Sequence, residues 1–160
     1  MSTRPESASW VTAASEAAER GLERFLKEGG YFVTTGQQPG LFAGPLYGLY
    51  KALTAVQLAS ALEPLLGRPV LPLFWVASED HDWEEADHTY LLDQRNELVT
   101  FRVPRQGGVP DRPLHRIPLD EGLEDLRESF LQTLPENEFN SPFFELIRDS
   151  YPKGGTLSGG

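Results

Sequence analysis

Apolar residues in the first half of the chain follow two spacings. One is the helical spacing, which runs over about 7–27 and again over 45–66, where nearly every face of the helix carries an apolar side chain. The other is the pattern of a strand: 31–35 is a short run of residues that favour β-structure, and 70–77 is a continuous apolar run, typical of a parallel strand covered on both faces. The order strand, helix, strand predicts a βαβ unit with a right-handed crossover and a buried central helix.

The second half of the chain predicts shorter elements. The segment 84–92 fits either a short helix or an ordered loop, and 97–103 and 114–119 are two predicted strands. Glycine and proline are frequent at 106–110, between those strands, so a hairpin is the simplest interpretation.

Two further helices and a tail complete the predicted organisation. Asp120 is placed to cap a helix that reaches about 134, and Ser141 with Pro142 opens another that reaches about 151. We expect one α/β domain, or a fragment of a larger one, whose parts are an N-terminal helix (1–30), a βαβ core (31–95), a β-hairpin insertion (96–119), a helical segment (120–152) and a tail with little to bury (153–160).

The first predicted strand ends in a glycine-rich loop that leads into the long helix. Gly36, Gly40 and Gly44 are spaced four apart, and Pro45 stands where its missing N–H costs the helix nothing. This spacing matches neither of the two common phosphate-binding fingerprints. The strand-loop-helix order nevertheless favours a polar or anionic ligand, with backbone N–H groups pointing at it, over a tight turn alone.

Polar side chains around this loop strengthen the case for a binding site. Gln37 and Gln38 offer amide donors and acceptors, although ordinary loop solvation would also explain them. Lys51 opposes the helix dipole, so local stability does not account for it. It could meet a ligand carboxylate or phosphate, with Tyr47 one turn earlier on the same face, or it could simply extend from a partly buried helix to solvent.

The second predicted strand ends in an acidic cluster with a histidine. We expect Asp80, His81 and Asp82 to form a catalytic or substrate-orienting group, in which His81 takes a proton and a carboxylate orients it or binds an amine. Parallel strands bring their carboxyl ends to one crevice, so this cluster should face the glycine loop. A metal site would also use such residues, but His81 and His88 lie seven apart, which fits no common zinc spacing. No metal is therefore predicted. The other alternative to a catalytic role is a structural one, in which the carboxylates of this cluster cap the helix that follows.

Composition limits the class of partner. The 160 residues include 24 acidic and 14 basic side chains, a net charge of -10, which argues against binding nucleic acid or an anionic membrane surface. Cysteine is absent, which removes disulfides, thiolate metal ligands and a cysteine nucleophile. No apolar run is long enough to span a bilayer and no signal-peptide pattern is present. We expect a cytoplasmic protein with small-molecule or protein partners.

Several of these motifs together resemble the N-terminal region of the bacillithiol biosynthesis cysteine-adding enzymes, the bacillithiol synthase family. The likeness is clearest between Tyr31 and His88. The residues that carry it are Thr35-Gly36-Gln37-Gln38, Gly40-Leu41-Phe42, Gly44-Pro45-Leu46-Tyr47, Tyr50-Lys51, Phe74-Trp75, Glu79-Asp80-His81-Asp82 and His88.

This resemblance implies a Rossmann-like parallel sheet core, related to class I aminoacyl-tRNA synthetases and nucleotidyltransferases, of which this shorter chain would carry the N-terminal half. It implies a ligase reaction that joins L-cysteine to the amine of glucosaminyl-malate to give bacillithiol. The substrate-binding residues would be Gly36, Gln37, Gln38, Gly44, Tyr47 and Lys51. A nucleotide cofactor follows from fold analogy alone, and a homo-oligomer is compatible with the family.

Two other functions are considered. As one part of a ligase, the isolated chain is expected to be inactive. The chain could instead be a non-catalytic binding or assembly module that is paired with the remainder of a larger protein. It could instead be a metal-dependent hydrolase built on the histidine and carboxylate cluster, which metal analysis would reveal.

Overall fold

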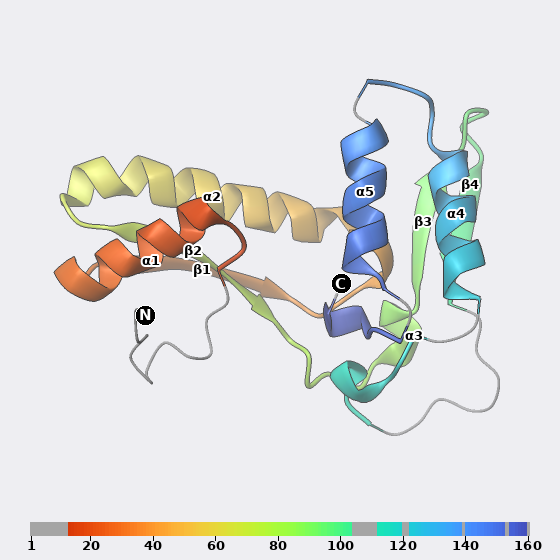
Figure 1. The fold of residues 1–160 in the computed structure, drawn as a ribbon, viewed down its shortest axis with the longest axis horizontal. Helices are drawn as coiled ribbons and strands as arrows, with labels where there is room; N and C mark the ends of the chain where they lie inside the picture. The colour runs from red at the N-terminus through yellow and green to blue at the C-terminus, as the bar shows by residue number, and fades with distance from the viewer. Residues whose placement is uncertain (1–12, 104–111, 120–121, 139, 153, 160) are drawn as a thin grey trace. The chain divides into compact units, whose positions relative to one another are not determined.

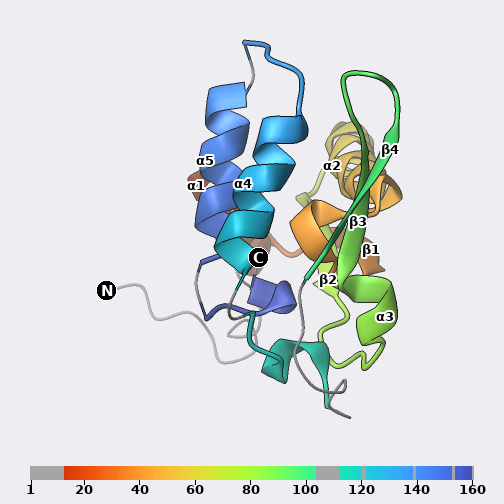
Figure 2. The same ribbon diagram turned by 90° about the vertical axis from the view of Figure 1, so that its right-hand side faces the viewer.

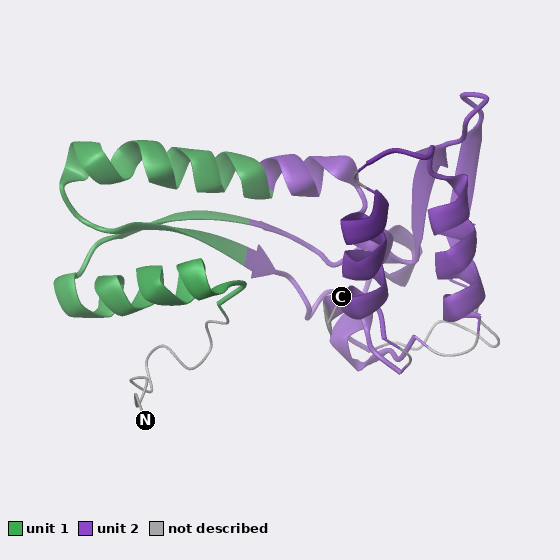
Figure 3. Ribbon diagram, turned by 45° about the horizontal axis from the view of Figure 1, so that its top comes forward, with its two compact units in different colours: residues 1–35, 52–74 green, residues 36–51, 75–160 purple. Residues whose placement is uncertain are grey.

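A computed structural model describes residues 13–103, 112–119, 122–138, 140–152 and 154–159. The predicted features at positions 7–12, 106–110 and 120 lie outside these residues. The chain divides into two compact units, which are described separately here (Figure 3). Unit 1 comprises Met1–Thr35 and Ala52–Phe74, and unit 2 comprises Gly36–Lys51 and Trp75–Gly160.

The predicted βαβ unit is present. Its elements, preceded by α1 (Glu16–Glu28), are β1 (Tyr31–Gln37), α2 (Leu46–Leu66) and β2 (Val70–Val76) (Figure 1). β1 and β2 pair in a two-stranded sheet. The Tyr31 amide donates to the Pro69 carbonyl, and the Ala77 amide donates to the Gln37 carbonyl, so the two strands run in the same direction.

Unit 1 packs helices on both faces of its part of this sheet (Figure 3). Phe25 of α1 and Phe32 of β1 place their ring centroids 4.4 Å apart. The small residues Ala55 and Ala59, one turn apart on α2, are the buried positions of that helix. Ser15 caps α1 by accepting a hydrogen bond from the Ala18 amide at 3.2 Å.

The expected burial of α2 and β2 is wrong for this chain. Leu53 is 49% exposed, although its helix is apolar on most sides, and Trp75 on β2 is 62% exposed. A two-stranded sheet offers a helix little surface to cover, and among the residues of α2 only Ala55 and Ala59 are buried. The other large apolar side chains exposed on these two elements are Leu46, Tyr47, Leu49, Tyr50, Val56, Leu58, Leu65, Leu66, Phe74 and Val76.

Unit 2 contains an antiparallel hairpin whose position differs from the prediction. β3 (His88–Leu92) pairs with β4 (Leu98–Arg102), with His88 opposite Arg102 and Leu92 opposite Leu98. The predicted strand at 114–119 is wrong, because Leu114–Arg116 forms a 3₁₀ turn. The segment 84–92 divides into a short helix, α3 (Trp83–Ala86), and strand β3.

The hairpin turn is built by one carboxylate. Asp93 Oδ1 accepts hydrogen bonds from the Arg95 amide at 2.8 Å and the Glu97 amide at 2.9 Å. The Glu97 amide, and then the Arg95 amide, hold the pKa of Asp93 below its usual value. Asn96 takes the left-handed conformation, with φ of 61°, that such a turn requires.

Helices α4 (Leu123–Thr133) and α5 (Asn140–Ser150) pack beside the hairpin in unit 2 (Figure 2). The rings of Phe101 on β4 and Phe130 on α4 meet edge to face, with centroids 5.3 Å apart. The tail also contributes: Leu157 is 2% exposed, which corrects the expectation that this segment buries little. The main hydrophobic core therefore belongs to unit 2.

The helices in the described part of the chain include none with both the length and the apolar character of a membrane span.

Candidate functional site

A lysine at the start of α2 gathers part of the predicted substrate-binding set. Lys51 Nζ donates to the Gly36 carbonyl at 3.1 Å and to Gln37 Oε1 at 3.0 Å. Gln37 Nε2 in turn donates to the Tyr47 hydroxyl at 2.8 Å, and Lys51 Nζ lies 5.2 Å from the centre of the Tyr47 ring. We call Gly36, Gln37, Tyr47 and Lys51 the lysine cluster. It lies within unit 2.

Gly36 is required by close backbone packing. A Cβ at this position would lie 2.6 Å from the Trp75 carbonyl oxygen, so a larger residue would push the two strand ends apart. The end of β1 is thereby held against the end of β2, and the Gly36 carbonyl stays in reach of Lys51.

The glycine loop is held in place by a tyrosine from the far end of the chain. The Tyr151 hydroxyl accepts from the Ala43 amide at 3.1 Å and donates to the Gly40 carbonyl at 3.1 Å. Burial raises the pKa of Tyr151, which keeps this hydroxyl protonated as a donor. Phe42 and Ala43 take left-handed conformations, with φ of 49° and 60°. Such backbone is costly for these residues and needs support of this kind.

These contacts change the expected role of the loop. The Ala43 amide is bonded to Tyr151, and the Gly44 amide donates to the Leu41 carbonyl at 3.0 Å. The prediction that backbone N–H groups point at a ligand is therefore wrong for these two positions. Gly44 itself is packed, because a Cβ there would lie 2.4 Å from Thr89 Oγ1.

The acidic turn after β2 uses its carboxylates on its own backbone. Asp80 Oδ1 accepts from the His81 amide at 2.7 Å and from the Asp82 amide at 3.1 Å. Asp82 Oδ1 caps α3 by accepting from the Glu85 amide at 3.1 Å. The Leu114 amide donates to the Asp80 carbonyl at 2.8 Å, which ties the turn to the 3₁₀ segment. The His81 side chain is exposed.

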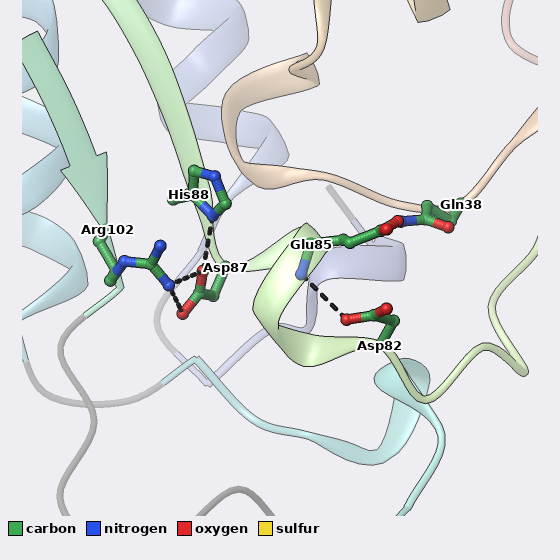
Figure 4. A network of polar contacts seen from close by, with 6 residues as sticks. All are labelled: Gln38, Asp82, Glu85, Asp87, His88 and Arg102. Atoms are coloured by element: carbon green, nitrogen blue, oxygen red, sulfur yellow. Dashed lines mark hydrogen bonds and ion pairs between the residues drawn. The ribbon is translucent and has the colours of Figure 1, made fainter.

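A second polar network lies where α3 meets the hairpin (Figure 4). Gln38 Nε2 donates to Glu85 Oε2 at 2.7 Å, which joins the glycine loop to α3. One residue beyond α3, the buried Asp87 carboxylate accepts from Arg102 Nη1, with 2.6 Å to Oδ2, and from His88 Nδ1, with 2.9 Å to Oδ1. The Val103 amide donates to the Asp87 carbonyl at 2.8 Å and closes the hairpin base.

The structure thus brings together some predicted site residues and separates others. Four of the six predicted binding residues form the lysine cluster, whereas Gln38 bonds to Glu85 and Gly44 packs on Thr89. Among the described residues, no hydrogen bond or ion pair joins Asp80, His81 or Asp82 to the lysine cluster, and their catalytic role stays a prediction. The described histidine and acidic residues form no group that could hold a metal ion.

Three residues of these networks were missed by sequence reasoning. Asp87 and Arg102 meet because His88 and Arg102 are partners across the hairpin, and the predicted strand pairing was a different one. Tyr151 reaches a loop more than one hundred residues earlier, as its bond to Ala43 shows. The Asp93 to Asn96 segment carries turn residues and could have indicated the hairpin, but no local signal indicates Tyr151.

Comparison with known proteins decides the family. The sequence profile described as "Bacillithiol biosynthesis BshC, N-terminal Rossmann-like domain" matches residues 6–159. The chain belongs to this family. The predicted Rossmann-like α/β class is confirmed by that match, and the resemblance noted between Tyr31 and His88 is confirmed with it.

Curated relatives of this BshC-family chain carry the name "Putative cysteine ligase BshC". One from Heliobacterium modesticaldum is 43% identical over 135 residues, covering 84% of this chain and 24% of the relative. One from Salinibacter ruber is 41% identical over 127 residues, covering 78% and 23%. One from Bacillus anthracis is 35% identical over 149 residues, covering 89% and 26%. The chain spans about a quarter of the length of these relatives.

Proposed function

We propose that this chain contributes the first part of the active-site crevice of a cysteine ligase, which adds L-cysteine to the amine of glucosaminyl-malate in bacillithiol biosynthesis. Family membership and the names of the relatives support a ligase. The observation that carries the substrate proposal is the lysine cluster, an ammonium group held at a strand end by two oxygen acceptors. No finding supports the hydrolase or the assembly module over this function.

The lysine cluster has the chemistry of a carboxylate site. An ammonium group has three donors, and two of those on Lys51 are directed to Gly36 and Gln37. The third is available for an anionic group, which the malate part of glucosaminyl-malate would supply twice over. Gln37 receives one of these bonds and gives another to Tyr47, so the lysine is oriented before a ligand arrives.

The acidic turn is proposed to receive the amine-bearing end of a substrate. Asp80 and Asp82 use Oδ1 in the backbone bonds described above, and a carboxylate has further lone pairs for an ammonium group such as that of cysteine. His81 is exposed beside them and is the acceptor that the sequence predicts for the amine proton.

Lys51→Ala is expected to weaken binding of glucosaminyl-malate to this chain by about tenfold or more, because a hydrogen bond to a charged group contributes roughly 1.5–3 kcal/mol. The side chain is exposed, so the free energy of unfolding should change by less than about 0.5 kcal/mol. A titration followed by amide NMR measures the affinity, and thermal melting measures the stability.

Lys27→Ala provides the matched control. It removes the same charge from the last turn of α1 in unit 1, so it should leave the affinity unchanged if binding is local to the lysine cluster. Equal loss of affinity in both variants would mean that the ligand senses only net charge. Unchanged affinity in Lys51→Ala would remove the lysine cluster from the proposal.

A further inference from the structure

We infer that His88, held by Asp87 and Arg102, rather than the exposed His81, accepts the amine proton when the amide bond forms. This inference rests on the proposed ligase function. It concerns the polar network at the base of the hairpin, which the predicted site did not include (Figure 4).

The imidazole of His88 has a fixed orientation. Its Nδ1 lies 2.9 Å from Asp87 Oδ1, and a carboxylate can only accept, so Nδ1 carries the proton of the neutral ring. The lone pair is then on Nε2, which has no hydrogen-bond partner among the described residues. The Tyr90 ring meets the imidazole edge to face at 5.1 Å, which adds a second restraint on its orientation. The side chain is 17% exposed, so Nε2 can be open to a small ligand while the ring stays fixed.

Asp87 and Arg102 act as positioning residues. The Asp87 side chain is 7% exposed, and the Arg102 guanidinium pairs with both of its carboxylate oxygens. Because Arg102 already balances the charge of Asp87, the carboxylate serves mainly to select the tautomer and direction of the His88 ring, as an orienting carboxylate does in other proton-transfer sites.

The position of His88 in the chain places it between two residues that contact the glycine loop. Three residues earlier, Glu85 accepts a hydrogen bond from Gln38. One residue later, Thr89 packs against Gly44. Residues on both sides of His88 therefore contact the glycine loop, which connects Gln37 to Tyr47 within the lysine cluster. The corresponding features are absent at His81, whose side chain is exposed and whose neighbouring carboxylates bond to backbone amides.

The step assigned to His88 is acyl transfer to nitrogen. The amine nitrogen of glucosaminyl-malate attacks the carbonyl carbon of cysteine whose carboxyl group has been activated as a mixed anhydride with phosphate, with a nucleoside triphosphate as phosphoryl donor. The C–N bond forms, the C–O bond to phosphate breaks, and the phosphate leaves with that electron pair. The surplus proton on nitrogen passes to His88 Nε2 and then to solvent.

The test uses a full-length chimera, in which this chain replaces the matching N-terminal quarter of the Heliobacterium modesticaldum relative. His88→Gln is expected to lower kcat by about 10²- to 10⁴-fold with little change in KM, because general base catalysis contributes that much. His115→Gln is the matched control, because His115 lies outside the proposed site with its Nδ1 3.0 Å from the Ser78 carbonyl oxygen, and it should change kcat only slightly. Added imidazole should restore part of the rate of His88→Ala, which a merely structural histidine would not allow.

Imidazole nitrogen NMR of the unmodified chain tests the geometry separately. We expect His88 with its proton on Nδ1, and a loss of that preference in Asp87→Asn together with a fall in kcat in the chimera. A kcat that is lost in His81→Gln and kept in His88→Gln would overturn the inference and leave the proposed function in place. A chimera without any activity, beside an active relative and a His88 ring with the expected tautomer, would instead contradict the proposed function of this chain.

Discussion

Bacillithiol formation from L-cysteine and glucosaminyl-malate is expected to be undetectable with this chain alone and to appear in the chimera with the Heliobacterium relative. The chain spans about a quarter of its relatives, so substrates held by the lysine cluster would lack partners on the other side. Orientation of reacting groups can account for roughly 7–11 kcal/mol of a barrier. Its loss corresponds to about 10⁵- to 10⁸-fold in rate. Product is measured by mass spectrometry, with and without a nucleoside triphosphate.

Three controls make this comparison decisive. The unmodified relative shows that the assay detects product, and the remaining three quarters of the relative alone show what it contributes without this chain. The chimera carrying Lys51→Ala should have a raised KM for glucosaminyl-malate, because the proposed carboxylate contact is removed. Robust turnover by the isolated chain would contradict the expectation directly, since it would place a complete site within 160 residues.

The sequence predicts the βαβ unit well because its signals are local. Pro45 and Gly67 bound a single long apolar run, and the structure places α2 at Leu46–Leu66 between them. The apolar run that begins at Val70 likewise gives β2 at nearly its predicted limits. Start and stop signals of this kind depend on neighbouring residues alone, so they can be recognised without knowledge of the tertiary structure.

Burial is predicted less well because it depends on what covers each face. The apolar character of α2 predicts a buried helix, yet Leu53 and Leu65 are exposed at 49% and 79%. Periodicity describes the sequence of one element and contains no information on how many neighbouring elements are present. In this chain, which spans about a quarter of the length of its relatives, the burial predicted from periodicity differs from the burial observed.

The candidate site shows the same limit. Lys51 and Tyr47 were found together because they are one turn apart on one helix, and Gln37 joins them at the end of the adjacent strand. The ion pair between Asp87 and Arg102 depends on the register in which β3 and β4 are paired. A shift of that register by one residue would move every side chain of a strand to the other face, and the sequence pattern did not identify the correct pairing. The capping role of Asp82, by contrast, follows from an aspartate placed three residues before Glu85, and it was among the alternatives considered.

Leu131→Ala is expected to destabilise unit 2 by roughly 2–5 kcal/mol, because the side chain is 2% exposed in the core and its removal leaves a cavity. This is a large part of the 5–15 kcal/mol typical of a folded domain. Leu53→Ala is the matched change on a helix position that the sequence assigns to a core. At 49% exposure in unit 1, it should cost less than about 1 kcal/mol.

Urea unfolding measures both variants, with tryptophan fluorescence reporting unit 2, which contains Leu131, and far-ultraviolet circular dichroism reporting the helices of unit 1, which contains Leu53. Trp83 is 3% exposed in the core of unit 2 and should report its unfolding, whereas Trp75 is 62% exposed and should change little. The midpoint should fall sharply for Leu131→Ala without a change of slope, since the same surface is exposed on unfolding. If Leu53→Ala lowered the midpoint as much as Leu131→Ala, the apolar face of α2 would be covered in solution, and the original expectation of a buried helix would be right.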